Sequence, residues 1–175
     1  MTRTGVDEAF DDWYLREHPR VVSTVAAITG RPSIAAECAD EAFTRACERW
    51  PRVRAMASPG GWVTTVALND ARRRLRRSGH ERRLLVWVAS TAPVEAPPPA
   101  WSPEVWEALA ALPPREREAV VLRYVADLPV GQVASIMGTA PGTAASTLHS
   151  ARARLARTLD PLALDPEENA DAARR

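Results

Sequence analysis

The sequence contains no lysine, so all 23 of its basic residues are arginines. It has only two cysteines and three histidines, and their spacing matches no metal-ligand pattern. Cys38 and Cys47 lie nine residues apart on an expected helix. They should point to opposite sides of that helix and form no disulfide. No nucleophile–base pair or glycine-rich phosphate loop is present, so we expect no enzyme, no metal and no cofactor.

Long apolar runs are also missing, and without a stretch of about 18 apolar residues no membrane-spanning helix is expected. The first ten residues are acidic and hold no apolar signal core, which predicts a cytoplasmic protein. The net charge is only +1, but 15 arginines stand against 11 acidic residues up to Ser90. A local basic surface on a nearly neutral chain favours site-specific nucleic-acid contact over bulk charge attraction.

The most informative stretch, residues 61–77, is expected to form an amphipathic helix. One side is apolar and available for a core: Val63, Ala67, Leu68, Ala71 and Leu75. The other side carries an indole, a hydroxyl, an amide and three guanidinium groups: Trp62, Thr65, Asn69, Arg72, Arg73 and Arg76. Arginine binds phosphate, indole stacks on unpaired bases, and Asn and Thr bond to base edges. The stretch alone does not exclude a solvated basic helix whose tryptophan is half buried in a core.

Two further helices are expected before this stretch, at 10–28 and 33–50, with a bend or break at Pro19 and Ser33 as an N-cap. A loop should follow to Gly60, with Ser58 capping a helix that ends near Ser78-Gly79. The helix expected at 33–50 has a polar, mainly acidic stripe: Glu37, Asp40, Glu41, Thr44, Arg45 and Glu48. The stripe is either ordinary solvated surface or a docking face for a basic partner.

Residues 89–103 contain five prolines, which predicts an extended linker that could reach roughly 45–50 Å. Beyond it four helices are expected, at 101–112, 115–125, 130–137 and 141–159. The last has a core stripe at Ala144, Leu148, Ala151 and Leu155. A short helix, a turn at Gly138 and a longer helix fit a helix-turn-helix, although helical hairpins share this layout.

Taken together, these segments resemble the extracytoplasmic-function (ECF) sigma factors of bacterial RNA polymerase. In the first half, residues 36–46 and 62–77 resemble the family's acidic helix and its W-L-x-x-I-A-x-N segment. In the second half, residues 108–124 and 138–154 resemble its A-L-x-x-L-P-x-R and G-T-V-K-S-R-L segments. The resemblance implies an all-α fold of two small helical domains and no catalytic activity.

The resemblance implies that the chain is divided into four parts. Sigma region 2 should occupy residues 6–86, a linker 87–103, region 4 residues 104–160 and an acidic tail 161–175. It also implies that the protein binds core RNA polymerase, recognises and melts promoter DNA, and is held inactive in many relatives by an anti-sigma factor. In relatives, the loop corresponding to residues 51–60 captures a flipped base.

Site residues carried over from the resemblance form three groups. Region 2 should bind the −10 element through Trp62, Thr65, Asn69, Arg72, Arg73 and Arg76. Region 4 should bind the −35 element through Thr143, Ser146, Thr147, His149, Ser150 and Arg152. Core polymerase should bind Glu37, Asp40, Glu41, Phe43, Thr44 and Arg45. The alternative function is a stand-alone helix-turn-helix regulator that binds duplex DNA without polymerase.

The chain departs from the family in its expected recognition helix. Residues 144–150 read AASTLHS where the family has V-K-S-R-L-x-R, so three cations are replaced by neutral residues. Arg152, Arg154 and Arg157 remain toward the far end of the helix, and Ala140 replaces the usual serine cap. Because each lost phosphate contact lowers affinity and its salt dependence, we expect a weak −35 interaction.

Restoring two of these cations, by Ala145→Lys together with Thr147→Arg, should strengthen promoter binding. Each new phosphate contact should also steepen the dependence of log affinity on log salt by about 0.9. Binding titrations at several salt concentrations measure both effects. An unchanged affinity would show that this helix contacts no phosphate at these positions.

Overall fold

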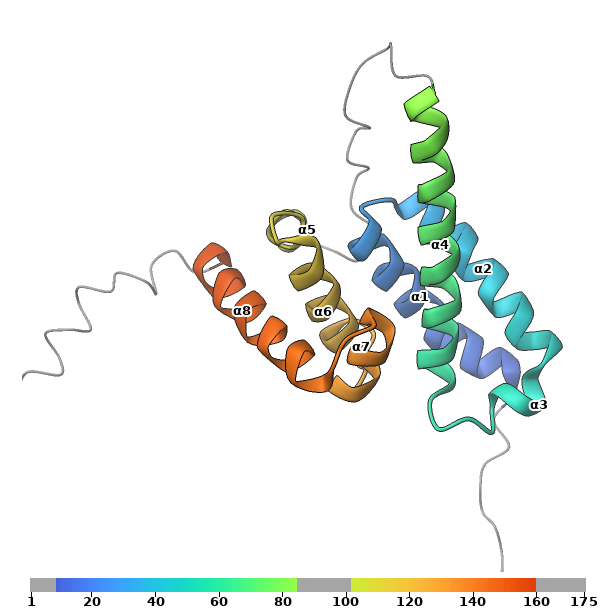
Figure 1. Ribbon diagram of the computed structural model, residues 1–175. Helices are drawn as coiled ribbons and strands as arrows, with labels where there is room; N and C mark the ends of the chain where they lie inside the picture. Colours follow the sequence, from blue (N-terminus) through green and yellow to red (C-terminus); the bar gives the residue numbers. More distant parts are fainter. Residues whose placement is uncertain (1–8, 85–101, 160–175) are drawn as a thin grey trace, which may run out of the picture.

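The computed structural model describes residues 9–84 and 102–159, and these ranges are helical with short connections (Figure 1). The all-α expectation is confirmed. Most of the expected linker and the whole expected tail lie outside the described residues. The helices, in chain order, are α1 (Phe10–Thr29), α2 (Pro32–Glu48), α3 (Trp50–Val53), α4 (Pro59–Leu84), α5 (Pro103–Ala110), α6 (Pro114–Tyr124), α7 (Val130–Met137) and α8 (Pro141–Leu159).

Helices α1, α2 and α4 pack on one another as a three-helix bundle, with α3 at one end (Figure 1). Aromatic rings fill that end. The ring centroid of Trp13 lies 5.0 Å from that of Phe43 and 4.8 Å from that of Trp50. The apolar side of α4 faces the same core, where Val63, Ala67, Leu68 and Ala71 are buried and Leu75 is half-buried. The periodicity predicted for this helix is therefore confirmed.

Helices α5–α8 form the second bundle. As the pattern of α8 predicted, Ala144, Leu148 and Ala151 are buried, while Leu155 packs partly buried on the same core. Gly138 ends α7 with φ +63°, a left-handed conformation that favours glycine and turns the chain into α8. The helix-turn-helix layout of α7 and α8 follows from that turn.

Several predicted helix boundaries were wrong. Helix α1 runs unbroken through Pro19. The carbonyl that Pro19 cannot bond belongs to Leu15, which is 71% exposed and can be hydrated. Helix α2 starts at Pro32, so Ser33 lies inside it and is not its N-cap. Proline suits the first turn of a helix, because the backbone N–H groups there have no hydrogen-bond partner within the helix and a missing N–H costs nothing.

The region around α3 and the end of α4 also differ from the prediction. Residues expected as loop or helix end form α3, with Pro51 in its first turn. Helix α4 continues past Gly79 to Leu84. A glycine inside a helix costs only about 1 kcal/mol, which neighbouring arginines of good helix propensity can offset.

The two bundles pack against each other, and their buried residues form one connected cluster. Helix α6 lies on α1, and α7 lies beside the beginning of α4 (Figure 1). The prolines between them predicted only a tether and gave no indication of this contact. Among the described helices, none is both long and apolar enough to cross a membrane.

Substitutions of two leucines test the packing of the first core. Leu68 is fully buried, whereas Leu15 is 71% exposed. Leu68→Ala should therefore lower the free energy of unfolding by about 2–5 kcal/mol, because it removes buried methyl groups and leaves a cavity. Leu15→Ala, the matched control, should change it by less than about 0.5 kcal/mol. Urea denaturation of each variant measures both values, and equal losses would contradict the described core.

Candidate nucleic-acid interface

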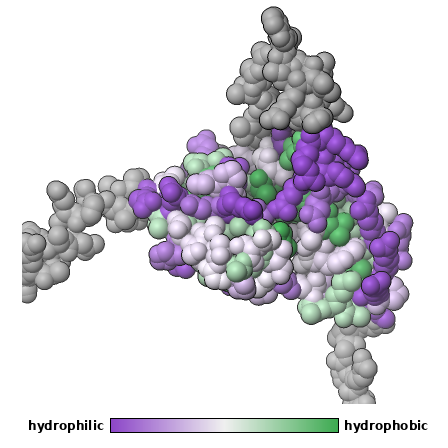
Figure 2. Space-filling view, in the orientation of Figure 1, coloured by the Kyte–Doolittle hydropathy of each residue, from purple (hydrophilic) through white to green (hydrophobic). Residues whose placement is uncertain are grey.

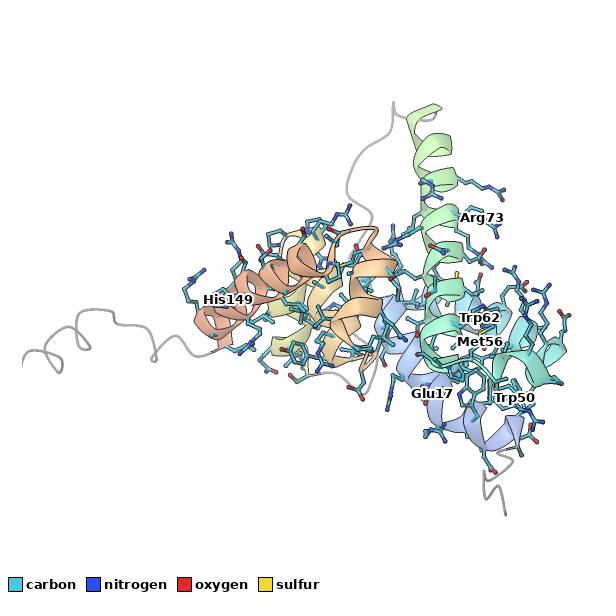
Figure 3. The ribbon with its side chains drawn as sticks, turned by 60° about the horizontal axis from the view of Figure 1, so that its bottom comes forward. Glu17, Trp50, Met56, Trp62, Arg73 and His149 are labelled. Carbon is cyan, nitrogen blue, oxygen red and sulfur yellow. The ribbon has the colours of Figure 1, made fainter. Side chains whose placement is uncertain are left out.

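The expected DNA-facing residues form a stripe along α4. Ser58 caps the helix, since its Oγ accepts a hydrogen bond of 3.1 Å from the backbone N–H of Gly61. Near the cap, Trp62 and Thr65 are half-buried, and farther along, Asn69, Arg73 and Arg76 are exposed. Figure 3 shows Trp62 near the start of α4 and Arg73 farther along the same helix. The stripe therefore has a covered beginning and an open end.

A buried carboxylate holds the open end in place. The Asp70 side chain, 5% exposed, accepts hydrogen bonds from the guanidinium groups of Arg73 and Arg74. Arg74 also donates to Glu37 of α2 over 2.6 Å. Burial alone would raise the pKa of Asp70, but hydrogen bonds from Arg73, Cys38 and Arg74 outweigh it and hold this pKa below its usual value. The charged carboxylate thereby links α4 to α2.

Cys38 of α2 completes this link. Its thiol donates to Asp70 Oδ2 over 3.4 Å. Burial, together with the hydrogen bond to Asp70, raises the pKa of Cys38 to about 11, so the thiol stays protonated and unreactive near neutral pH. Cys47 is exposed on the opposite side, and both cysteines are free, as their helical spacing predicted.

A cleft of about 390 Å³ opens between α2 and α4 along the exposed end of the stripe. The groups that surround it suit a nucleotide, since they offer an apolar wall, an amide and three guanidinium groups. Its lining residues are Arg45, Val66, Asn69, Asp70, Arg73 and Arg76. Hydrophilic side chains gather over this part of α4 in Figure 2.

The covered beginning of the stripe faces the second bundle. Trp62, Thr65 and Val66 of α4 form one wall of a largely apolar groove, and α7 forms the other with Gln132, Ser135 and Ile136. Arg72 makes an ion pair with Glu118 of α6, a residue that is only 8% exposed. Two of the expected DNA-facing side chains thus line the interface between the bundles, and a third is bonded across it.

The expected −35 residues lie on α8. Thr143, Ser146, His149, Ser150 and Arg152 are exposed, whereas Thr147 is half-buried. The hydroxyls of Ser146 and Thr147 donate to the carbonyl of Thr143, at 2.9 and 2.8 Å. Figure 2 shows a pale surface of intermediate hydropathy around α7 and the beginning of α8. This end of the recognition helix is therefore polar and uncharged.

The expected polymerase-binding residues of α2 divide into surface and core. Glu37, Asp40, Glu41 and Thr44 are exposed, and Arg45 is half-buried with a 2.9 Å ion pair to Glu41. Phe43 is 2% exposed and packs against the rings of Trp13 and Tyr14. Its side chain supports the helix from inside.

Comparison with known proteins identifies both halves of the chain. A model of sigma-70 region 2 matches residues 13–81, and a model of sigma-70 region 4 matches residues 102–155. The RNA polymerase sigma factor CarQ of Myxococcus xanthus is 30% identical over 172 residues, which cover 93% of this chain and 96% of CarQ. The ECF RNA polymerase sigma factor SigM of Mycobacterium tuberculosis is 34% identical over 160 residues, covering 86% of this chain and 77% of SigM.

The chain belongs to the ECF sigma factors. It is thus a non-catalytic subunit that binds core RNA polymerase and directs promoter-specific initiation of transcription. The match to region 2 sets aside the alternative of a stand-alone regulator.

Solved structures share the fold of this sigma factor. The sigma factor RpoE of Bartonella quintana, crystallised with the anti-sigma factor NepR, superposes with a TM-score of 0.72 at 21% identity over 86% of this chain and 96% of its own. CnrH, in complex with the cytosolic domain of CnrY, has a TM-score of 0.56 at 18% identity over 91% of this chain and 92% of its own.

Two residues of the interface were missed as contact residues by the reasoning from sequence. Asp70 has a local signal, because arginines three and four residues later can pair with it on one helix face. Glu118 has none, since its partner Arg72 lies 46 residues away.

Neutralising the buried carboxylate tests the link between α2 and α4. Asp70→Asn should lower the free energy of unfolding by about 1–3 kcal/mol near neutral pH, because the arginines lose a charged acceptor. A depressed pKa stabilises the fold above the unfolded value of about 3.9, and this contribution is lost as pH falls through the folded pKa. The difference between wild type and variant should therefore shrink in acid.

Chemical denaturation between neutral pH and about pH 3 measures this difference. Asp40→Asn is a suitable control, since Asp40 has a 64% exposed side chain bonded to His18 and should show a much smaller loss. A gap between wild type and Asp70→Asn that widens on acidification would contradict the role assigned to Asp70.

Proposed function

We propose that the stripe on α4 is the surface of region 2 that opens and holds the −10 element. Trp62 offers a ring for an unpaired base, and Thr65 and Asn69 offer polar groups for base edges. Arg72, Arg73 and Arg76 supply positive charge for the strand's phosphates. The observation that carries the proposal is that this stripe, opposite the buried side of α4, leads into the arginine-lined cleft.

The exposed acidic groups of α2 form the proposed docking face for core polymerase. Glu37, Asp40 and Glu41 share one side of the helix with Thr44 and Arg45, and we assign Phe43 a supporting role because its ring is buried. The Asp70 link joins this face to the DNA-binding stripe. The surface that docks on polymerase and the surface that binds the unpaired DNA strand would then belong to one rigid unit.

Region 4 is proposed to bind duplex DNA at the −35 element through α8. The residues offered are Thr143, Ser146, Thr147, His149, Ser150 and Arg152. Their side chains are short and mostly neutral, which supports a weak upstream contact. We keep the proposed boundaries of region 2 at 6–86 and of region 4 at 104–160, with an acidic tail beyond.

Regulation by an anti-sigma factor is also part of the proposal. Its support is that the relatives RpoE and CnrH were solved in complexes, RpoE with an anti-sigma factor and CnrH with the cytosolic domain of CnrY. We place the action of this sigma factor in the cytoplasm, where core polymerase and promoter DNA meet.

Replacing one indole tests the role of α4. Trp62→Ala should leave binding to core polymerase unchanged, because the proposed docking face lies on α2. It should reduce open-complex formation roughly tenfold or more, since stacking contributes about 1–3 kcal/mol per base. Trp62→Phe, which keeps an aromatic ring, should recover part of the activity.

Run-off transcription on genomic fragments and permanganate footprinting of unpaired thymines measure the effect. Core binding is followed in parallel by co-elution with polymerase. An undiminished yield of open complexes with Trp62→Ala would refute the proposed role of the indole.

A further inference from the structure

The groove between the beginning of α4 and α7 has a volume of about 210 Å³. Its lining residues come from both bundles, with Ser58, Gly61, Trp62, Thr65 and Val66 on the side of α4 and Gln132, Ser135 and Ile136 on the side of α7. None of these residues carries a charge. Since an unpaired charge is costly to remove from water, a molecule that enters this groove should be neutral.

The walls of the groove favour an aromatic ring. Trp62, Val66 and Ile136 are partly buried hydrophobic residues that pack against the core. A second ring packs well beside an indole, either offset-stacked or edge to face. A cavity of about 150 Å³ holds benzene, so the slightly larger volume found here suits a molecule of one ring or two fused rings.

The hydroxyl groups that line the groove already have partners. Thr65 Oγ1 donates to the carbonyl of Gly61 over 2.7 Å, and Ser135 Oγ donates to the carbonyl of Gly131 over 3.0 Å. Ser58 Oγ accepts the N–H of Gly61 at 3.1 Å. These three groups are occupied in holding their own helices.

The side-chain oxygen of Gln132 is different. It is buried and accepts no hydrogen bond from any residue that the structure describes. It lies against Gly61, where an added Cβ would stand 2.6 Å from it, so the absence of a side chain at position 61 leaves room for the amide. A buried acceptor without a partner is unfavourable, and a donor brought by a ligand would remove that cost.

We propose that this groove is a binding site for a small, neutral aromatic molecule that carries one N–H or O–H donor, the chemistry shared by indoles and phenols. The ring packs among Trp62, Val66 and Ile136, and the donor bonds to Gln132 Oε1. The site is separate from the arginine-lined cleft between α2 and α4, whose guanidinium groups suit phosphates.

A ligand in the groove touches two members of the α4 stripe, Trp62 and Thr65. Its effect on transcription therefore rests on the proposed function of that stripe. An unpaired base that stacks on the indole needs surface that the ligand would cover, so the two should compete. This sigma factor would then respond directly to a small molecule.

An NMR titration of the isotope-labelled full chain with indole tests the site. Indole should bind with a dissociation constant of roughly 0.1–1 mM, because so small a ligand makes few contacts. The largest shifts should appear at the backbone amides of Gly61, Thr65 and Ser135. Thr44 lines a different cleft, beside the rings of Phe10 and Tyr14, and its amide is the control for non-specific binding.

Benzofuran is the matched ligand, since it has the shape of indole with an oxygen in place of the N–H group. It should bind roughly tenfold more weakly than indole, because it leaves Gln132 Oε1 unpaired. Equal affinities of the wild type for indole and benzofuran would overturn the proposal. Shifts spread equally over both clefts, or no shift at millimolar indole, would overturn it as well.

Two variants locate the hydrogen bond. Gln132→Leu removes the acceptor and should abolish the preference for indole over benzofuran. Ser135→Ala is the control, since the hydroxyl of Ser135 bonds within α7 and the preference should stay at roughly tenfold. A preference that persists in Gln132→Leu would contradict the assigned contact. Thermal melting shows whether each variant is folded, and the comparison of the two ligands on the wild type needs neither variant.

Transcription separates this site from the proposed function. Indole near saturation should lower the yield of open complexes made by the wild type with core polymerase, and benzofuran at the same concentration should lower it less. If indole binds the groove with the expected preference but leaves this yield unchanged, the site stands and the proposed role of Trp62 fails. If Trp62→Ala abolishes open complexes but indole does not bind, the site fails alone.

Discussion

Region 2 depends on one buried carboxylate. Three successive arginines on one helix repel one another and would spread toward solvent if nothing held them. Asp70 accepts hydrogen bonds from two of them, and Arg74 extends the network to Glu37 on the neighbouring helix. The result is a cation-rich surface with defined geometry, which an unstructured run of arginines could not provide.

The two proposed DNA-binding surfaces differ in their chemistry. Helix α4 combines a ring, an amide and several guanidinium groups beside a cleft, whereas the first turns of α8 expose small polar groups. Two hydroxyls of α8 are already bonded to its own backbone, and Arg154 is paired with Glu116. If the proposed sites are right, most of the affinity for a promoter is expected to arise at the −10 element, where the strands separate.

Sequence periodicity predicted the helices and both buried faces well, because the apolar side of an amphipathic helix packs against other apolar side chains. The buried residues of α4 and α8 follow directly from spacing. Boundaries at Ser33 and Gly79 were missed because Pro32 could occupy a first turn and a single glycine is tolerated inside a long helix.

The site was predictable to the extent that it is local. The stripe from Trp62 to Arg76 lies on one helix, so its members could be named from their angular positions. Glu118 could not be named, since its pairing with Arg72 depends on how two separate bundles meet. The burial of Phe43 likewise depends on aromatic rings contributed by α1.

The shared core has a consequence for the solubility of the protein. Since the buried residues of both bundles form one connected cluster, any separation of the bundles would expose apolar surface on α1 and α6. Exposed apolar surface of this kind promotes aggregation. A chain with its bundles separated would therefore be more prone to aggregation than one with the bundles packed.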